Sequence, residues 1–454
     1  MDSEWSNMVD SGKVAEGSEL KPDLSNWDKE DPARSSSKQA WLTLWITTYS
    51  MIIAFCVWFL VSAIAPKLNE IGFDLTTSQL YWLTALPGLS GGLLRLLYMV
   101  LPPIIGTRRL VAYSSLLFVV PMIGWFVAVQ DTNTPYWWLL VLSFLCGIGG
   151  GSFSGYMPST GYFFPKSKSG TALGIQAGIG NLGMSIIQLV GPWLMGFGLL
   201  GLGAMTPQRT SDGESMFVYN AAIVFVPWAI VAAILALELL KDVPVKANIR
   251  EQLDIFSNPN TWYMTLMYVM TFGLFSGFAA QFGLLIQNNF GSTSQFAGME
   301  GLPQGVTYAF LGPLISSLVR VAWGPLCDRF GGAIWTFVSI VGMSASLFIC
   351  TFFLRPDSPD EFTGFLWAMI AMFVFSGIGN AGTFKQMPMI MPARQAGGAI
   401  GFTAAIAAFG PFFVGIALTA MTPYLWYMIC VVFGALCAVI CWFRYARPGA
   451  PFPG

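Results

Sequence analysis

The chain has 454 residues, of which 55% are hydrophobic and only 10% are charged, and its mean hydropathy is +0.63. Soluble globular proteins carry about 25% charged residues, so this composition excludes a soluble protein and predicts a helical membrane protein. A membrane β-barrel is excluded because its strands of about 10 residues alternate apolar and polar positions, whereas the apolar runs here are continuous. The net charge of −1 identifies no partner, and we expect none among nucleic acids.

Apolar runs bounded by charged or turn residues predict twelve membrane-spanning helices. A span needs about 20 apolar residues, and several of these runs are longer, which indicates tilt or kinks. The first six spans would form a bundle over 41–240 and the last six a bundle over 261–443. In chain order the predicted spans are 41–65, 79–103, 109–129, 135–162, 169–200, 216–240, 261–289, 304–326, 333–354, 363–391, 397–421 and 424–443.

The distribution of Lys and Arg predicts that both chain ends face the cytoplasm, where cations gather. Of the 22 cations, sixteen lie in the two tails or in the connections after even-numbered spans, three lie in the opposite connections, and three fall inside spans. We expect a flexible cytoplasmic tail over 1–40 without a cleavable signal, a cytoplasmic linker over 241–260 and a C-terminal tail over 444–454.

The chain offers few residues for metal, cofactor or proton chemistry. The seven cysteines lie in or beside apolar runs without metal-ligand spacing, so they are interpreted as core residues and no cofactor or enzyme activity is predicted. Histidine is absent, and every Asp and Glu lies in a tail, in a loop or near a span end. The usual proton-relay side chains are therefore missing from the middle of the predicted spans.

Two halves of the sequence resemble each other. The segment 147–158 matches 377–388 through Gly-Ile-Gly and Met-Pro, and the glycine-rich segment 170–183 matches 397–410. Chance similarity between glycine-rich helices is the alternative, but the matching segments occur in the same order in both halves. A parallel six-plus-six repeat predicts a substrate site between halves that rock to give alternating access.

The most informative residues are Arg95 and Arg320, lone cations in matching places of the two halves. Each is followed eleven residues later by a glycine, Gly106 or Gly331. An arginine at membrane depth costs roughly 2.5–3.5 kcal/mol, so a symmetric pair without a carboxylate partner predicts an anionic substrate. Guanidinium presents paired N–H donors that match a planar oxyanion. Snorkelling or pairing with backbone carbonyls is the alternative for each arginine alone.

Three further features are weaker candidates for the site. Glycines of the fifth span, among them Gly178 and Gly180, either allow close helix packing or bare the backbone to a small anion. Asn181 in the same run is a candidate ligand. Lys385 either contributes positive charge to the substrate path or snorkels to the cytoplasmic end of its helix.

Several motifs together resemble a known transporter family. Asp-Arg-Phe-Gly-Gly at 328–332 resembles the loop signature of the major facilitator superfamily, although its partner loop at 106–109 lacks the acid. The segments 85–95 (ALPGLSGGLLR) and 170–183 (GTALGIQAGIGNLG), and more loosely 399–410 (AIGFTAAIAAFG), resemble the bacterial nitrate/nitrite porters. The resemblance extends from about Trp27 to the C-terminus and implies a fold of twelve helices in two halves.

This resemblance implies residue roles and a function. The implied substrate-binding residues are Arg95 and Arg320, with Asn181 and Tyr268 as hydrogen-bonding partners and Phe153 and Phe272 enclosing the planar ion. It implies a monomeric nitrate/nitrite antiporter of the bacterial inner membrane; proton-coupled uptake and, from another class, a membrane anion sensor remain alternatives. Lys385 stands where a close relative within that family has glutamine, which bears on coupling more than on substrate class.

Overall fold

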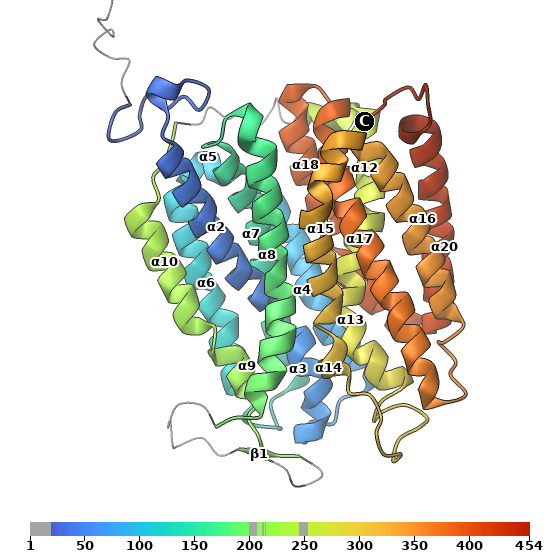
Figure 1. Cartoon of the computed structure of the whole chain (residues 1–454). Coiled ribbons are helices and arrows are strands. Elements are labelled where there is room, and N and C mark those ends of the chain that lie inside the picture. The colour runs from blue at the N-terminus through green and yellow to red at the C-terminus, as the bar shows by residue number, and fades with distance from the viewer. Residues whose placement is uncertain (1–19, 199–206, 211–212, 214, 245–252) are drawn as a thin grey trace, which may run out of the picture.

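The computed structural model is a bundle of long helices in which the start of the first span and the C-terminus lie at the same end (Figure 1). Within the described residues, eleven helical segments are long and apolar enough to cross a membrane. A further helix of 22 residues, α4 (Thr77–Tyr98), has sufficient length but is rich in polar residues and glycine, and it completes the twelve predicted spans. The structure describes residues 20–198, 207–210, 213, 215–244 and 253–454.

The N-terminal half contains six spans, two of which are divided into shorter helices. Polar caps set several helix starts: Thr76 and Gln79 form a capping box at the start of α4, and the Ser36 side chain accepts from the backbone of Gln39. Besides α4, the helices of this half are α2 (Ser37–Trp58), α3 (Leu60–Leu68), α5 (Pro102–Ile105), α6 (Thr107–Ala128), α7 (Tyr136–Gly161), α8 (Lys166–Met195), α9 (Tyr219–Ile223) and α10 (Val226–Leu239). The two short strands β1 (Gln208–Arg209) and β2 (Ser215–Met216) pair antiparallel in the loop before α9.

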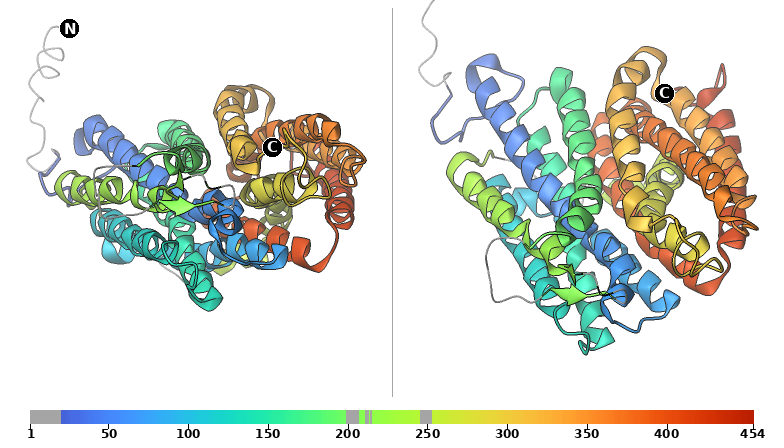
Figure 2. Two further views of the ribbon diagram at one scale, coloured as in Figure 1. Left: turned by 90° about the horizontal axis from the view of Figure 1, so that it is seen from below. Right: turned by 60° about the horizontal axis from the view of Figure 1, so that its bottom comes forward.

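The C-terminal half repeats this plan, and three of its spans are divided. The seventh span is α12 (Pro259–Tyr268) and α13 (Leu274–Asn289), joined without interruption by a π-helical turn over Val269–Gly273. The remaining helices are α14 (Gly305–Tyr308), α15 (Leu311–Phe330), α16 (Gly332–Thr351), α17 (Phe362–Ile390), α18 (Ala393–Ala407), α19 (Gly410–Ala420) and α20 (Pro423–Cys441), which a π-helical turn extends to Ala446. Figure 2 shows the two halves side by side.

The backbone supports the repeat inferred from the sequence. Gly106, between α5 and α6, has φ +81° and ψ 158°, and Gly331, between α15 and α16, has φ +86° and ψ 157°. Residues with side chains rarely adopt this positive φ. The glycine eleven residues after each arginine therefore makes the same turn into the third span of its half.

Some predicted span boundaries were wrong at their ends. The second span stops at Tyr98 rather than 103, and the short helix α5 follows it as a separate element. The eighth span reaches Phe330 rather than 326, because the glycine turn comes only after that residue. The eleventh span, predicted as continuous, is interrupted between α18 and α19 just before Gly410.

The predicted flexible tail over 1–40 needs correction in its described part, since α2 begins at Ser37 and residues 20–36 pack on the bundle. Leu24 is buried, the Trp27 indole donates to the carbonyl of Tyr162, and the Lys29 ammonium donates to that of Gly161. These contacts attach the segment to the connection between α7 and α8.

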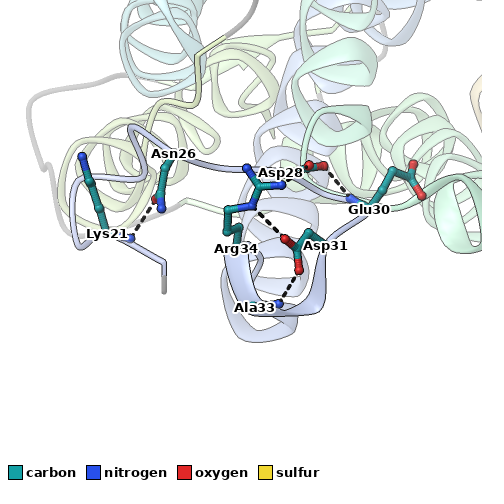
Figure 3. Close-up of polar contacts among 7 residues, drawn as sticks. All are labelled: Lys21, Asn26, Asp28, Glu30, Asp31, Ala33 and Arg34. Carbon is teal, nitrogen blue, oxygen red and sulfur yellow. Dashed lines mark hydrogen bonds and ion pairs between the residues drawn. The ribbon is translucent and has the colours of Figure 1, made fainter. Parts of the chain in front are cut away.

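Figure 3 shows the polar contacts that shape the N-terminal segment itself. Arg34 bridges Asp28 and Asp31 at 3.0 and 2.8 Å. The hydrogen bond from Arg34 is the main reason why the pKa of Asp31 lies below its usual value. Local charge pairing thus gives this part of the tail a defined shape.

The other connecting segments also contain structure. In the predicted linker 241–260, Leu253–Ser257 form a 3-10 turn and α12 begins at Pro259, whereas 245–252 lie outside the described residues. The predicted C-terminal tail begins later than 444, because the π-helical turn continues to Ala446. The chain then folds back, and the carbonyl of Gly454 accepts from the backbone N–H of Ala333 at 2.9 Å.

Candidate functional site

Arg95 is fully buried and connects the two halves. It lies in the last turn of α4, and its Nε donates to the carbonyl of Gly150, near the middle of α7, at 2.9 Å. Its Nη1 donates to the carbonyl of Ala404, on α18 of the other half, at 2.8 Å. The remaining nitrogen, Nη2, is buried without a partner. Arg95 is therefore held rigidly by backbone oxygens and still has a donor available.

Aromatic rings surround the Arg95 guanidinium. Its Cζ lies 4.6 Å from the ring centroid of Phe153, 5.2 Å from that of Trp58 and 5.5 Å from that of Phe272. A guanidinium at such distances is attracted by ring faces, and more strongly where water is excluded. These contacts stabilise the buried cation without neutralising its charge.

Arg320 lies on α15 and is 5% exposed. Its Cζ is 4.8 Å from the ring centroid of Phe384 on α17, and its Nη1 is buried without a hydrogen-bond partner. The Nη1 of Arg95 donates to a backbone carbonyl, whereas the Nη1 of Arg320 does not. Arg320 thus also has a donor available for a bound group.

One continuous aromatic cluster joins the two arginines. Phe272, beside Arg95, stacks on Tyr268 with centroids 5.1 Å apart and planes 9° apart. Tyr268 in turn packs on Phe384 at 5.0 Å, and Phe384 contacts Arg320. The Tyr268 hydroxyl is buried and unpartnered. Tyr268 directly precedes the π-helical turn and Phe272 lies within it. Such turns are frequent at functional sites.

No carboxylate pairs with either buried arginine among the described residues. The ion pairs there involve other residues: Arg34 with Asp28 and Asp31, Lys67 with Glu70, and Lys385 with Asp328. Two buried cations without counter-ions are costly in a low-dielectric interior. An anion bound between the halves would offset that cost.

The glycine run of α8 performs a packing role at its central positions. A Cβ on Gly178 would lie 2.3 Å from Val321 of α15, next to Arg320, and a Cβ on Gly180 would lie 2.5 Å from Met51 of α2. Both glycines therefore allow α8 to approach a neighbouring helix closely. Asn181, on the same helix, is 1% exposed and its Oδ1 has no partner.

Lys385 does not join the arginine cluster. Its ammonium lies 2.6 Å from a carboxylate oxygen of Asp328 at the end of α15, and the two side chains are 38% and 66% exposed. The structure thus brings Arg95, Phe153, Phe272 and Tyr268 together, but it places Lys385 in a half-exposed ion pair.

Sequence reasoning did not identify Phe384 and Trp58 as site residues. Neither stands out in a chain with 15% aromatic residues. The internal repeat could have indicated Phe384 as a candidate. It aligns Phe384 with Ser154, the residue directly after Phe153 on the matching helix α7. Trp58 carried no such signal, since its position depends on how α2 packs against α4 and α7.

Hydrogen bonds join the two halves toward the end of the bundle away from the C-terminus, which Figure 1 marks. The Thr84 hydroxyl donates to Gln281 Oε1 at 2.5 Å, and the Gln188 amide donates to the carbonyl of Ala279 at 2.9 Å. Each bond joins a helix of one half to a helix of the other. On this side of the arginines, hydrogen bonds from side chains thus hold the two halves together.

Some glycines nearer the other end of these helices have open space beside them. A Cβ on Gly174 of α8, Gly324 of α15 or Gly397 of α18 would meet no atom within 4 Å. By comparison, a Cβ on Gly88 would lie 2.5 Å from the backbone of Phe412. Among the described residues, these two hydrogen bonds between the halves therefore lie on the side of the arginines away from the C-terminus.

The fold and the sequence both define this chain as a transporter of the Major Facilitator Superfamily. A model of that superfamily matches residues 47–384. The crystal structure of a D-xylose-proton symporter superposes with a TM-score of 0.64 at 14% identity, covering 92% of this chain and 98% of that one. At this identity the likeness concerns the fold alone.

Closer relatives narrow the family. The chain is 51% identical over 440 residues to the probable nitrate/nitrite antiporter NarK2 of Thermus thermophilus, covering 95% of this chain and 98% of that protein. It is 34% identical over 460 residues to the nitrate/nitrite transporter NarU of Escherichia coli (strain K12), covering 93% and 96%. The chain belongs to the nitrate/nitrite porter family of this superfamily.

Proposed function

We propose that this protein exchanges nitrate and nitrite across the bacterial inner membrane, as a monomer with both chain ends in the cytoplasm. The observation that carries the proposal is the pair of buried arginines, each with an unpartnered N–H group and neither with a carboxylate counter-ion. Relatives named as nitrate/nitrite antiporter and transporter support the choice of substrate.

In this proposal Arg95 and Arg320 bind the anion from the two halves. Paired guanidinium N–H groups suit a planar oxyanion, and the Tyr268 hydroxyl and the Asn181 amide add neutral hydrogen-bonding groups. The rings of Phe153 and Phe272 favour a flat, weakly hydrated ion over a tetrahedral one. Gly178 and Gly180 let the neighbouring helices come close enough to enclose it.

The two halves would alternate access by rocking about this site. The hydrogen bonds that join the halves at the end away from the C-terminus would break as the other end closes, with the anion held between the halves. Without an anion, two like charges in a low-dielectric site oppose closure. The empty carrier would therefore return slowly, and inward transport of one anion would depend on outward transport of another.

Counterflow in proteoliposomes tests this proposal. We expect liposomes loaded with nitrite to take up labelled nitrate quickly, and anion-free liposomes to take up little. Fast accumulation in anion-free liposomes under an inward proton gradient would instead indicate proton-coupled uptake. Nitrate binding by the purified protein without either flux would indicate an anion sensor.

A further inference from the structure

Asn380 is a buried amide that the contacts described above do not use. It lies on α17, is 0% exposed, and neither its Oδ1 nor its Nδ2 has a partner. Buried amides are nearly always hydrogen-bonded, and an unpaired one is costly, the more so in a membrane interior. An unsatisfied donor and acceptor in one buried side chain therefore point to a bound group as their partner.

The face of α17 that carries Asn380 points to Arg320. Gly377, Asn380 and Phe384 follow one another at three- and four-residue spacing, which places them on one side of a helix. A Cβ on Gly377 would lie 2.5 Å from the carbonyl of Ser316, one turn before Arg320 on α15, and Phe384 contacts Arg320 directly. Asn380 lies between these two contacts.

The internal repeat places Asn380 in the same way. The match of 147–158 with 377–388 aligns Asn380 with Gly150, whose carbonyl accepts from Arg95 Nε at 2.9 Å. Packing agrees with this alignment, because a Cβ on Gly147 would contact Ser90 and Gly91, as one on Gly377 contacts Ser316. Asn380 therefore occupies, beside Arg320, the position from which α7 holds Arg95.

We infer that Asn380 is a binding residue of the anion site, contributed by the C-terminal half. Its amide nitrogen donates to the bound anion, while its amide oxygen accepts from the Arg320 guanidinium and fixes that side chain. An amide can do both, since it carries an acceptor and two donors. Thr271, whose hydroxyl is also buried and unpartnered, lies in the π-helical turn and close to Gly379, the residue before Asn380.

This inference rests on the proposed function, and Asn380→Leu tests it. If the amide only fills space, leucine removes an unpaired polar group, so it stabilises the protein and leaves anion affinity unchanged. If the amide binds the anion, leucine weakens nitrate binding by on the order of tenfold or more, the size of a hydrogen bond to a charged group, and abolishes the thermal stabilisation by nitrate. Should the leucine variant not fold, Asn380→Ala carries the same test.

The measurement is equilibrium binding of labelled nitrate, and of nitrite by competition, to the purified protein in detergent, with thermal unfolding alongside. Asn380→Asp keeps an acceptor but loses the donor and adds a negative charge, so we expect no binding. Gln386→Leu is the matched control, because this second amide of α17 is equally buried and unpartnered but packs against Gly332, away from the arginines. We expect wild-type affinity there.

The outcomes separate this inference from the proposed function. Absence of nitrate binding by the wild-type protein would refute the proposed function. If the wild type binds, unchanged affinity in Asn380→Leu or in Asn380→Asp overturns the role of the amide. An equal loss in Gln386→Leu also overturns it, because the effect would then belong to buried amides in general.

Discussion

Arg95→Lys separates the geometry of the site from its charge, and we expect it to abolish transport. In the structure the guanidinium uses Nε for Gly150, Nη1 for Ala404 and leaves Nη2 available. An ammonium is a single centre and cannot hold both carbonyls and an anion in the same places. The variant keeps the positive charge but loses the preorganised donor.

The size of the effect follows from those bonds. A hydrogen bond to a charged group contributes about 1.5–3 kcal/mol, and 1.4 kcal/mol corresponds to about tenfold in affinity. Loss of the one bond from Nη2 to the anion therefore weakens nitrate binding by about 10- to 100-fold. Loss of the bond to Ala404 would also weaken the contact between α4 and α18, so we expect the exchange rate to change as well.

Nitrite-loaded proteoliposomes with labelled external nitrate provide the assay, after normalisation to the reconstituted protein. Arg355→Lys is the control, because this arginine also packs on an aromatic ring, Tyr424, at 4.8 Å but lies in a loop. We expect wild-type exchange for Arg355→Lys and only background exchange for Arg95→Lys. Exchange near the wild-type rate in well-folded Arg95→Lys would refute a role for the guanidinium in anion binding.

Three other expectations concern packing, charge and substrate shape. Gly178→Ala places a Cβ 2.3 Å from Val321, so we expect a loss of about 1–3 kcal/mol in stability and slower exchange. Val321→Ala in the same chain should restore both, and Gly174→Ala, which meets open space, should change neither. Lys385→Gln should retain anion exchange, because half-exposed ion pairs such as that with Asp328 contribute about 0.2–1 kcal/mol; loss of exchange would return Lys385 to the transport mechanism. Small planar monoanions should compete with nitrate in the exchange assay, with chlorate inhibiting weakly at most. Sulfate inhibiting as strongly as nitrate would contradict enclosure of the anion between aromatic rings.

The sequence alone determined the number of spans, their order and the division into two halves. This was possible because a lipid environment forces each span to satisfy its backbone internally and to be apolar, so that spans are visible in composition. It also singled out Arg95 and Arg320 as lone cations within spans, since a cation in an apolar run is conspicuous wherever the run packs. The sequence also showed that a glycine, Gly106 or Gly331, follows each arginine by eleven residues, and the structure gives both glycines a positive φ.

Only the tertiary structure decided which side chains surround the arginines. Phe384 lies 64 residues from Arg320 in the chain and contacts it at 4.8 Å, because the rotation and crossing of packed helices set such neighbours. In a uniformly apolar bundle these rotations leave little trace in hydropathy. The sequence likewise left two alternatives for Lys385, and the tertiary structure places it in a half-exposed ion pair with Asp328.

The tertiary structure also decided where helices deviate from regularity. The π-helical turn after Tyr268 and the interruption before Gly410 lie against each other, since a Cβ on Gly410 would overlap the carbonyl of Gly273. The local sequence indicates a regular helix at both places. The irregular turns occur where the two backbones approach each other closely. Composition thus specified the helices, whereas contacts between residues distant in the chain specified the geometry of the site.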